Sequence, residues 1–250
     1  MKKGVTYFKG ILSNKKAEIQ NFYSLAYQIR QVRPKSIWIG DSHAHHLINQ
    51  GAVMQKISIT ADNNLLVWIG PRLLYSVSRK GFEFDFLTRI MLKIASKNQN
   101  VFFVLGEIDC RVYLVSKTLP GGPDAFAEIA KNYIHEVSML LQNFGLKRAI
   151  IVGPVPPSDS GAQSSEFPRN GTLAERVFVT KMLTESLLKC STSDVLMVEL
   201  APILSVENGC LDPLLSDDGI HVNRKGSKIA LDEIFKKEVT TGADDNVDWR

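Results

Sequence analysis

The sequence has few cysteines and no long apolar run. Its three cysteines, Cys110, Cys190 and Cys210, are widely spaced and form no CxxC pair, which argues against a disulfide framework and a cysteine zinc site. No run approaches the roughly 18 apolar residues that indicate a membrane helix. The N-terminus contains lysines but neither the apolar segment nor the small-residue cleavage site of a signal peptide. These absences predict a reduced, cytoplasmic protein without a membrane span.

A strong excess of one charge is also lacking. The net charge is only +4, which is too small to indicate a nucleic-acid partner. Residues 1–35 nevertheless hold eight Lys or Arg residues against one acidic residue, Glu18, so this segment carries +7 and the rest of the chain −3. Such a segment can contact an acidic partner or a membrane surface, but it is more often a solvated helix face. We expect a basic N-terminal helical extension over residues 1–35 and a flexible polar tail over 239–250.

Apolar segments of two kinds alternate along the chain. Five short runs are almost continuously apolar, as in parallel strands that are covered on both faces. These runs are 36–40, 65–70, 101–106, 148–153 and 195–200. Helical patterns occur at 15–32, 83–97, 123–145, 173–189 and 224–239. Strands that alternate with helices predict an α/β protein with a five-stranded parallel sheet and right-handed crossovers.

The length and composition fit one large domain, which we place at residues 36–238. A chain of 250 residues with 44% hydrophobic content can bury a sizeable core. In an open parallel sheet, ligands bind beyond the carboxyl ends of the strands. The segments that follow these ends, among them Asp41-Ser42 and the Pro- and Ser-rich loop 153–172, are therefore the candidates for a functional site.

The segment "SIWIGDSHAHHL" (36–47) joins the first strand to a serine and three histidines. A serine is a poor nucleophile unless a base accepts its proton and a third group orients that base. Ser42 follows a strand and should begin a helix, where backbone N–H groups and the helix dipole favour negative charge. This position suits both nucleophilic attack and stabilisation of an oxyanion.

The base that Ser42 requires is found near the other end of the chain. In "LSDDGIHVN", Asp218 and His221 are three residues apart, a spacing that can place both side chains on one side of a single turn. The carboxylate can then hold one imidazole nitrogen while the other faces Ser42. An Asp-x-x-His pair alone is weak evidence, but it gains weight beside a Gly-Asp-Ser that follows the first strand.

With these residues, the sequence resembles the SGNH, or GDSL-type, hydrolase family over about residues 36–235. "IGDSH" (39–43) matches the family's first block and Asp218-Gly-Ile-His221 its last. The resemblance implies a flavodoxin-like, three-layer αβα sandwich with five parallel strands. It also implies a nucleophilic Ser42, with His221 as base and Asp218 as its partner. The backbone N–H groups of Ser42 and Gly70 would form the oxyanion hole.

The third block departs from the family pattern. The family has Gly-x-Asn-Asp, whereas this chain has "GEID" (106–109), so Ile108 replaces an asparagine that donates to the oxyanion. Isoleucine has no hydrogen-bond donor on its side chain. Arg111 could supply a charged donor instead, as a third member of the oxyanion hole. Alternatively, Glu107, Asp109 and Arg111 form a local ion-pair network that shapes the loop.

The histidines after Ser42 allow three interpretations. His43 and His46 are three positions apart and could share a helical face. No cysteine or acidic residue follows Ser42 in this segment to complete a metal site, so we expect no metal. A substrate contact for His43 or His46 is the second interpretation, and of these we place His43 in the site together with Glu107 and Asp109. Helix packing or capping is the third.

The sequence therefore predicts a serine esterase that acts on carboxylic esters through an acyl-enzyme, without a cofactor. The polar loop 153–172 favours a sugar-like substrate, such as an O-acetylated carbohydrate, over a long acyl chain. One alternative is an O-acyltransferase with the same triad. Another is a catalytically weak protein of this fold that binds a glycan or a protein, which Ile108 supports. The pattern does not indicate the acyl group, the acceptor or the oligomeric state.

Overall fold

The structure is a computed structural model that describes residues 22–49, 54–95, 99–118, 121–161 and 165–241. Most of the predicted basic extension and the predicted tail from residue 242 onward lie outside the described residues. Within the predicted extension, residues 22–32 form a helix, and Ile29 of this helix is buried in the core.

One sheet runs through the molecule, with the strand order β2-β3-β1-β4-β5-β6. The strands are β1 (Ile37–Gly40), β2 (Ile57–Ile59), β3 (Leu65–Trp68), β4 (Asn100–Val104), β5 (Arg148–Val152) and β6 (Val195–Val198). Five of them are parallel, in the order β3-β1-β4-β5-β6, which is the flavodoxin-like arrangement. The prediction of the five parallel strands and of the fold class is confirmed.

The predicted strand count was wrong by one, because the sheet has a sixth strand. The short strand β2 pairs antiparallel with β3 at the sheet edge. Its three residues, Ile-Ser-Ile, are all only partly buried. They include a serine and therefore lack the continuous apolar character by which the other strands were predicted. Asn63, which has a positive φ of 62°, lies in the tight turn between β2 and β3.

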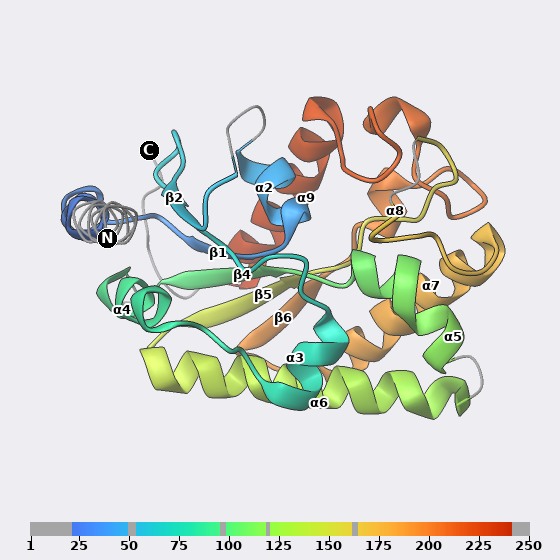
Figure 1. Cartoon of the computed structure of the whole chain (residues 1–250), viewed down its shortest axis with the longest axis horizontal. Coiled ribbons are helices and arrows are strands. Elements are labelled where there is room, and N and C mark those ends of the chain that lie inside the picture. Colours follow the sequence, from blue (N-terminus) through green and yellow to red (C-terminus); the bar gives the residue numbers. More distant parts are fainter. Residues whose placement is uncertain (1–21, 50–53, 96–98, 119–120, 162–164, 242–250) are drawn as a thin grey trace, which may run out of the picture.

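Helices cover both faces of the sheet (Figure 1). One face carries α2 (Ser42–Ile48), α8 (Ala201–Leu204) and α9 (Arg224–Thr241). The other carries α3 (Leu74–Lys80), α4 (Phe86–Ala95), α5 (Leu114–Thr118), α6 (Gly122–Phe144) and α7 (Leu173–Cys190). A π-helix, η1 (Asp109–Tyr113), precedes α5, and a short 3-10 helix, η3 (Pro213–Leu215), precedes α9. The protein is therefore a three-layer αβα sandwich.

Each face of the sheet has its own hydrophobic core. The core beneath α2 and α9 centres on Trp38 and Phe102, whose rings stack with centroids 4.3 Å apart. The opposite core contains Phe103 and Tyr133 and extends to Ile29. Successive strand residues point to opposite faces, so both cores hold the same strands in place.

The strand register aligns the candidate segments at one end of the sheet. Gly40 pairs with Trp68 on one side and with Val104 on the other. Ser42, Gly70 and Gly106 therefore each follow this row by two residues. A side chain at Gly40 would collide with the carbonyl oxygen of Val104 and with Ala44, so glycine lets α2 pack closely on β1 and β4.

In the part of the chain that the structure describes, none of the helices is both long and apolar enough to span a membrane.

Candidate active site

Ser42 is the first residue of α2, directly after the first strand of the sheet. The Asp41 carboxylate caps this helix, since Oδ1 accepts a hydrogen bond of 2.8 Å from the backbone N–H of His43. The Ser42 side chain is partly buried. A helix start leaves its first N–H groups without intrahelical acceptors, so the Ser42 N–H is available to a ligand.

His221 and Asp218 lie in one turn after η3. Asp218 Oδ1 accepts hydrogen bonds from the backbone N–H groups of Ile220 and His221, at 2.8 and 2.7 Å. Its Oδ2 is 2.7 Å from His221 Nδ1. Ser216 closes the turn by donating its hydroxyl to the carbonyl of His221 at 2.6 Å. The local chain thus fixes the orientation of the imidazole.

The fold brings this turn to Ser42. His221 Nε2 lies 2.8 Å from Ser42 Oγ, although 179 positions separate the two residues in the chain. The predicted Ser42–His221 and His221–Asp218 contacts are both present. Helix α9 supports the arrangement, because the Ser227 hydroxyl donates to the carbonyl of Leu47 in α2.

The surroundings keep His221 neutral. Burial lowers its pKa, the nearby His43 lowers it further, and the result is about 4. Burial opposes the charge of Asp218, but the hydrogen bonds from His221 and Ile220 lower its pKa to about 2. A neutral imidazole beside an ionised carboxylate is the state in which His221 can accept a proton from Ser42.

Two of the histidines that follow Ser42 contact His221. The His46 ring stacks on the His221 ring with centroids 4.0 Å apart, and the His43 ring lies 4.7 Å away. His43 is 3% exposed, and its Nε2 lies 3.0 Å from Glu107 Oε2. Both rings therefore lie on the side of α2 that meets His221. The predicted site did not include His46. Its contact with His221 could have been inferred, because a residue four positions after Ser42 lies on the same face of a helix as Ser42.

Arg111 is committed to contacts within the protein. Its Nε and one terminal nitrogen donate to the two carboxylate oxygens of Glu107, at 2.6 and 3.1 Å. The other terminal nitrogen donates to the carbonyl of Phe167 at 2.5 Å. The geometry matches the alternative interpretation, a local ion-pair network, for Glu107 and Arg111 but not for Asp109. It offers the predicted oxyanion role of Arg111 no support.

Asp109 binds the start of helix α3 and not the Arg111 network. It is fully buried, and its two oxygens accept the backbone N–H groups of Leu74 and Tyr75 at 2.7 and 2.9 Å. Burial raises its pKa to about 7. These contacts fix the first turn of α3, so the predicted substrate contact of Asp109 is replaced by a capping role. Ile108 is 4% exposed and packs as a core residue.

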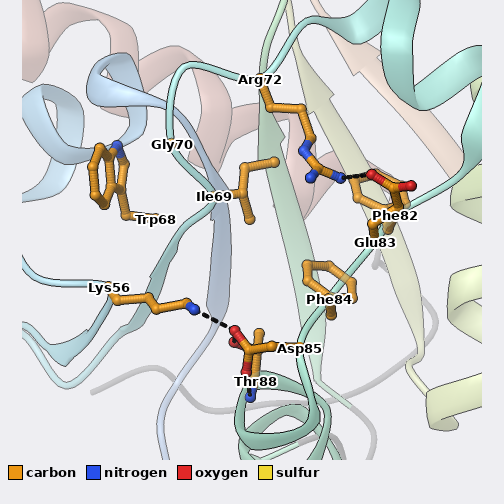
Figure 2. A pocket seen from close by; sticks show the side chains of 10 residues that line it. All are labelled: Lys56, Trp68, Ile69, Gly70, Arg72, Phe82, Glu83, Phe84, Asp85 and Thr88. Atoms are coloured by element: carbon orange, nitrogen blue, oxygen red, sulfur yellow. Dashed lines mark hydrogen bonds and ion pairs between the residues drawn. The ribbon is translucent and has the colours of Figure 1, made fainter.

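Gly70 borders a pocket of about 310 Å³ at the end of β3 (Figure 2). Gly70 has a φ of 77°. A Cβ placed on it would have no other heavy atom within 4 Å, so this side of the residue is open. Two ion pairs cross the pocket, Arg72 with Glu83 and Lys56 with Asp85. Ser42, Asp218 and His221 are not among the residues that line it. Gly70, which follows β3 by two residues, relates the pocket to Ser42, since β3 is paired with β1.

The loop 153–172 joins the Arg111 network to the Asp218 turn. At one end, the Asn170 N–H donates to the Arg111 carbonyl at 2.9 Å, besides the contact of Phe167 with the guanidinium. Near the middle of the loop, Gly161 packs so closely on Gly219 and Asp218 that a Cβ on either glycine would collide with the facing backbone. The described part of this loop therefore packs directly against the Asp218 turn.

Comparison with known proteins gives the fold a name. No family model matches the sequence, and no curated protein matches it. Among solved structures, a GDSL-like lipase from Bacteroides thetaiotaomicron is similar with a TM-score of 0.52 and 14% identity, over 92% of this chain and 98% of the other. The chain has the SGNH hydrolase fold. A candidate acylhydrolase from Bacteroides fragilis is also similar, with a TM-score of 0.50 and 14% identity, over 86% of this chain and 94% of the other.

The SGNH fold accounts for the placement of Ser42 and of the Asp218 turn at the same end of the sheet. Over the described residues, no group of three or more His, Cys, Asp or Glu side chains is arranged to hold a metal ion.

Proposed function

We propose that this protein is a serine esterase that cleaves carboxylic esters through an acyl-enzyme on Ser42. The observation that carries this proposal is the chain of short contacts from Ser42 Oγ through His221 to Asp218, at 2.8 and 2.7 Å. Such contacts activate a serine, because the base takes its proton as the carbon–oxygen bond forms.

The proposed reaction has two stages. In the first, Ser42 Oγ attacks the ester carbonyl carbon while His221 Nε2 takes the hydroxyl proton, and the alcohol leaves with that proton. In the second, His221 deprotonates a water molecule, which attacks the acyl carbon. The bond from that carbon to Ser42 Oγ then breaks, Oγ takes the proton back from His221, and the carboxylic acid leaves. Asp218 stabilises the His221 imidazolium that forms in both stages.

The oxyanion would be held by the backbone N–H groups of Ser42 and Gly70. The start of α2 and the open space beside Gly70 support these assignments. A third donor, the family's asparagine, is replaced by the buried Ile108, and Arg111 is bound to Glu107. Because one missing donor costs about a hundredfold or more in turnover, we expect slow hydrolysis.

For the substrate, we propose short acyl groups on a polar alcohol, with O-acetylated carbohydrates as the first class to test. The loop that packs on the Asp218 turn supports this choice. Ser158 and Ser160 present hydroxyls there, 2.6 Å apart and exposed, and Asp159 is 59% exposed. A polar wall of this kind favours a hydroxyl-rich group over a long alkyl chain.

The test is hydrolysis of p-nitrophenyl acetate by the wild-type protein and by Ser42→Ala. We expect slow turnover in the wild type and none above background in the variant, with both proteins folded. Turnover that survives Ser42→Ala would contradict the proposal. Product analysis with acetylated sugars, in the presence and absence of a sugar acceptor, then separates hydrolysis from acyl transfer, which uses the same residues.

A further inference from the structure

His43 lies between the proposed base and a buried ion pair. On one side its ring faces the His221 ring at 4.7 Å, and on the other its Nε2 contacts Glu107 at 3.0 Å. Glu107 in turn binds Arg111 through two hydrogen bonds. His43 and Glu107 are both less than a tenth exposed. The site therefore continues inward from His221 through His43 and Glu107 to Arg111.

At acidic pH, the positive charges of His43 and Arg111 outnumber the negative charge of Glu107. Glu107 faces two cationic partners, and one carboxylate cannot neutralise both. Burial opposes the charges of both Glu107 and His43. The hydrogen bond from His43 helps to lower the pKa of Glu107 to about 2, whereas the Asp41 charge and then the hydrogen bond to Glu107 raise the pKa of His43. Asp41 supplies a second negative charge, but burial raises its pKa to about 6. Below that pH, one positive charge is in excess next to His221.

We propose that His43 is a positioning residue which, as a buried imidazolium held by Glu107, keeps His221 unprotonated and extends the reaction into acidic solution. This inference rests on the proposed function of Ser42 and His221. A positive charge near His221 disfavours a second one on its ring. The base therefore stays available at pH values at which an ordinary histidine is charged.

The groups that face His221 come from two elements. From α2 these are Ser42, His43 and His46, and from its own turn Asp218. Asp218 favours the charged imidazole, whereas the two histidines oppose it. His46 is in closer ring contact than His43, but burial and the neighbouring His43 lower its pKa, so it is neutral near pH 7. The charge of His43 lowers the pKa of His221 more than that of His46 does, although the His46 ring is closer, so the two substitutions have different expected effects.

The experiment compares the pH dependence of kcat/KM for wild type, His43→Gln and His46→Gln. For His43→Gln we expect the acid limb to move up by about one pH unit, which is a tenfold change in the proton affinity of His221. For His46→Gln we expect a smaller shift, because the charge of His46 lowers the pKa of His221 less than the charge of His43 does. A limb that stays in place in His43→Gln, or that moves more in His46→Gln, would overturn the inference.

A second measurement does not depend on a variant that folds. The ring nitrogens of the five histidines can be followed by 15N NMR in the wild-type protein as the pH is changed. We expect His43 to carry two ring protons at pH 6 while His221 carries one. A neutral His43 at that pH would overturn the inference. Loss of turnover in Ser42→Ala tests the proposed function separately, so failure of one claim is distinguishable from failure of the other.

Discussion

At the scale of single residues, we interpret His43 and His46 as neighbours that lower the pKa of His221, and not as metal ligands. His43 and His46 both pack against its ring, and His43 links it to Glu107. Burial and His43 together lower the pKa of His221. A histidine with these neighbours is a weaker base than usual, but it is one that stays neutral in mild acid.

We predict that kcat/KM for p-nitrophenyl acetate falls only as the pH drops through about 4. His221 must be neutral to accept the Ser42 proton, and its pKa is lowered from 6.5 to about 4, so the base form persists above that value. The rate should be measured from acid to neutral pH, with circular dichroism at each pH to verify folding. An acid limb near 6.5 in the folded protein would contradict this prediction.

Arg111 illustrates a residue whose role follows from its partners. We predict that Arg111→Ala destabilises the protein by about 3 kcal/mol or more, because removing one partner leaves the buried Glu107 charge uncompensated. Urea unfolding measures this loss. The matched control is Arg72→Ala, which breaks a more exposed pair with Glu83 and should cost about 1 kcal/mol or less.

The contrary result for Arg111→Ala is also specific. Unchanged stability combined with more than about a tenfold loss of turnover, or about 1.4 kcal/mol of transition-state stabilisation, would indicate that the guanidinium contacts the oxyanion. The Arg111→Lys variant adds a further comparison, because lysine keeps the charge but loses the planar fork that binds both oxygens of Glu107.

At the scale of elements, the loop 153–172 and the Asp218 turn depend on each other. They meet where Gly161 and Gly219, both at positive φ, bring the two backbones together. A Cβ at Gly219 would collide with the carbonyl of Ser160. The position of the Asp218 carboxylate is therefore sensitive to the packing of this loop.

We predict that Gly219→Ala lowers turnover per folded molecule by more than about tenfold, since a displacement of about 1 Å at a catalytic group has effects of this size. Gly145→Ala is the matched control. Gly145 also has a positive φ, of 65°, but it ends α6 and has open space around it. The control should lose about 1 to 2 kcal/mol of stability from backbone strain and keep its turnover. Equal activity in the two variants would argue against the coupling.

The elements that the sequence predicted are those with a strong local pattern. The five parallel strands follow from continuous apolar runs, and the helices α4, α6, α7 and α9 follow from helical apolar patterns. Asp218 and His221 are linked by a local spacing. By contrast, Asp109 caps a helix that precedes it by 35 positions, and His43 meets Glu107 across 64 positions. Such contacts depend on which strands are neighbours, so spacing along the chain does not reveal them.

At the scale of the whole molecule, one sheet supports the site from both faces. Trp38 and Phe102 lie in the core beneath α2 and α9, which carry Ser42 and follow His221, respectively. We predict that Trp38→Ala costs about 3 to 5 kcal/mol of unfolding free energy, as for other large-to-small core substitutions. Urea unfolding followed by far-UV circular dichroism measures it, and a loss below about 1 kcal/mol would contradict the buried, stacked position.

The central claim is that Ser42 is the nucleophile. The most direct measurement is reaction of the folded protein with a fluorophosphonate, followed by intact-mass and peptide mass spectrometry. We expect a single adduct on Ser42, absent in Ser42→Ala and strongly slowed in His221→Gln, because the imidazole no longer accepts the proton. Absence of an adduct on the folded wild type, or an adduct that persists unchanged in Ser42→Ala, would contradict the account.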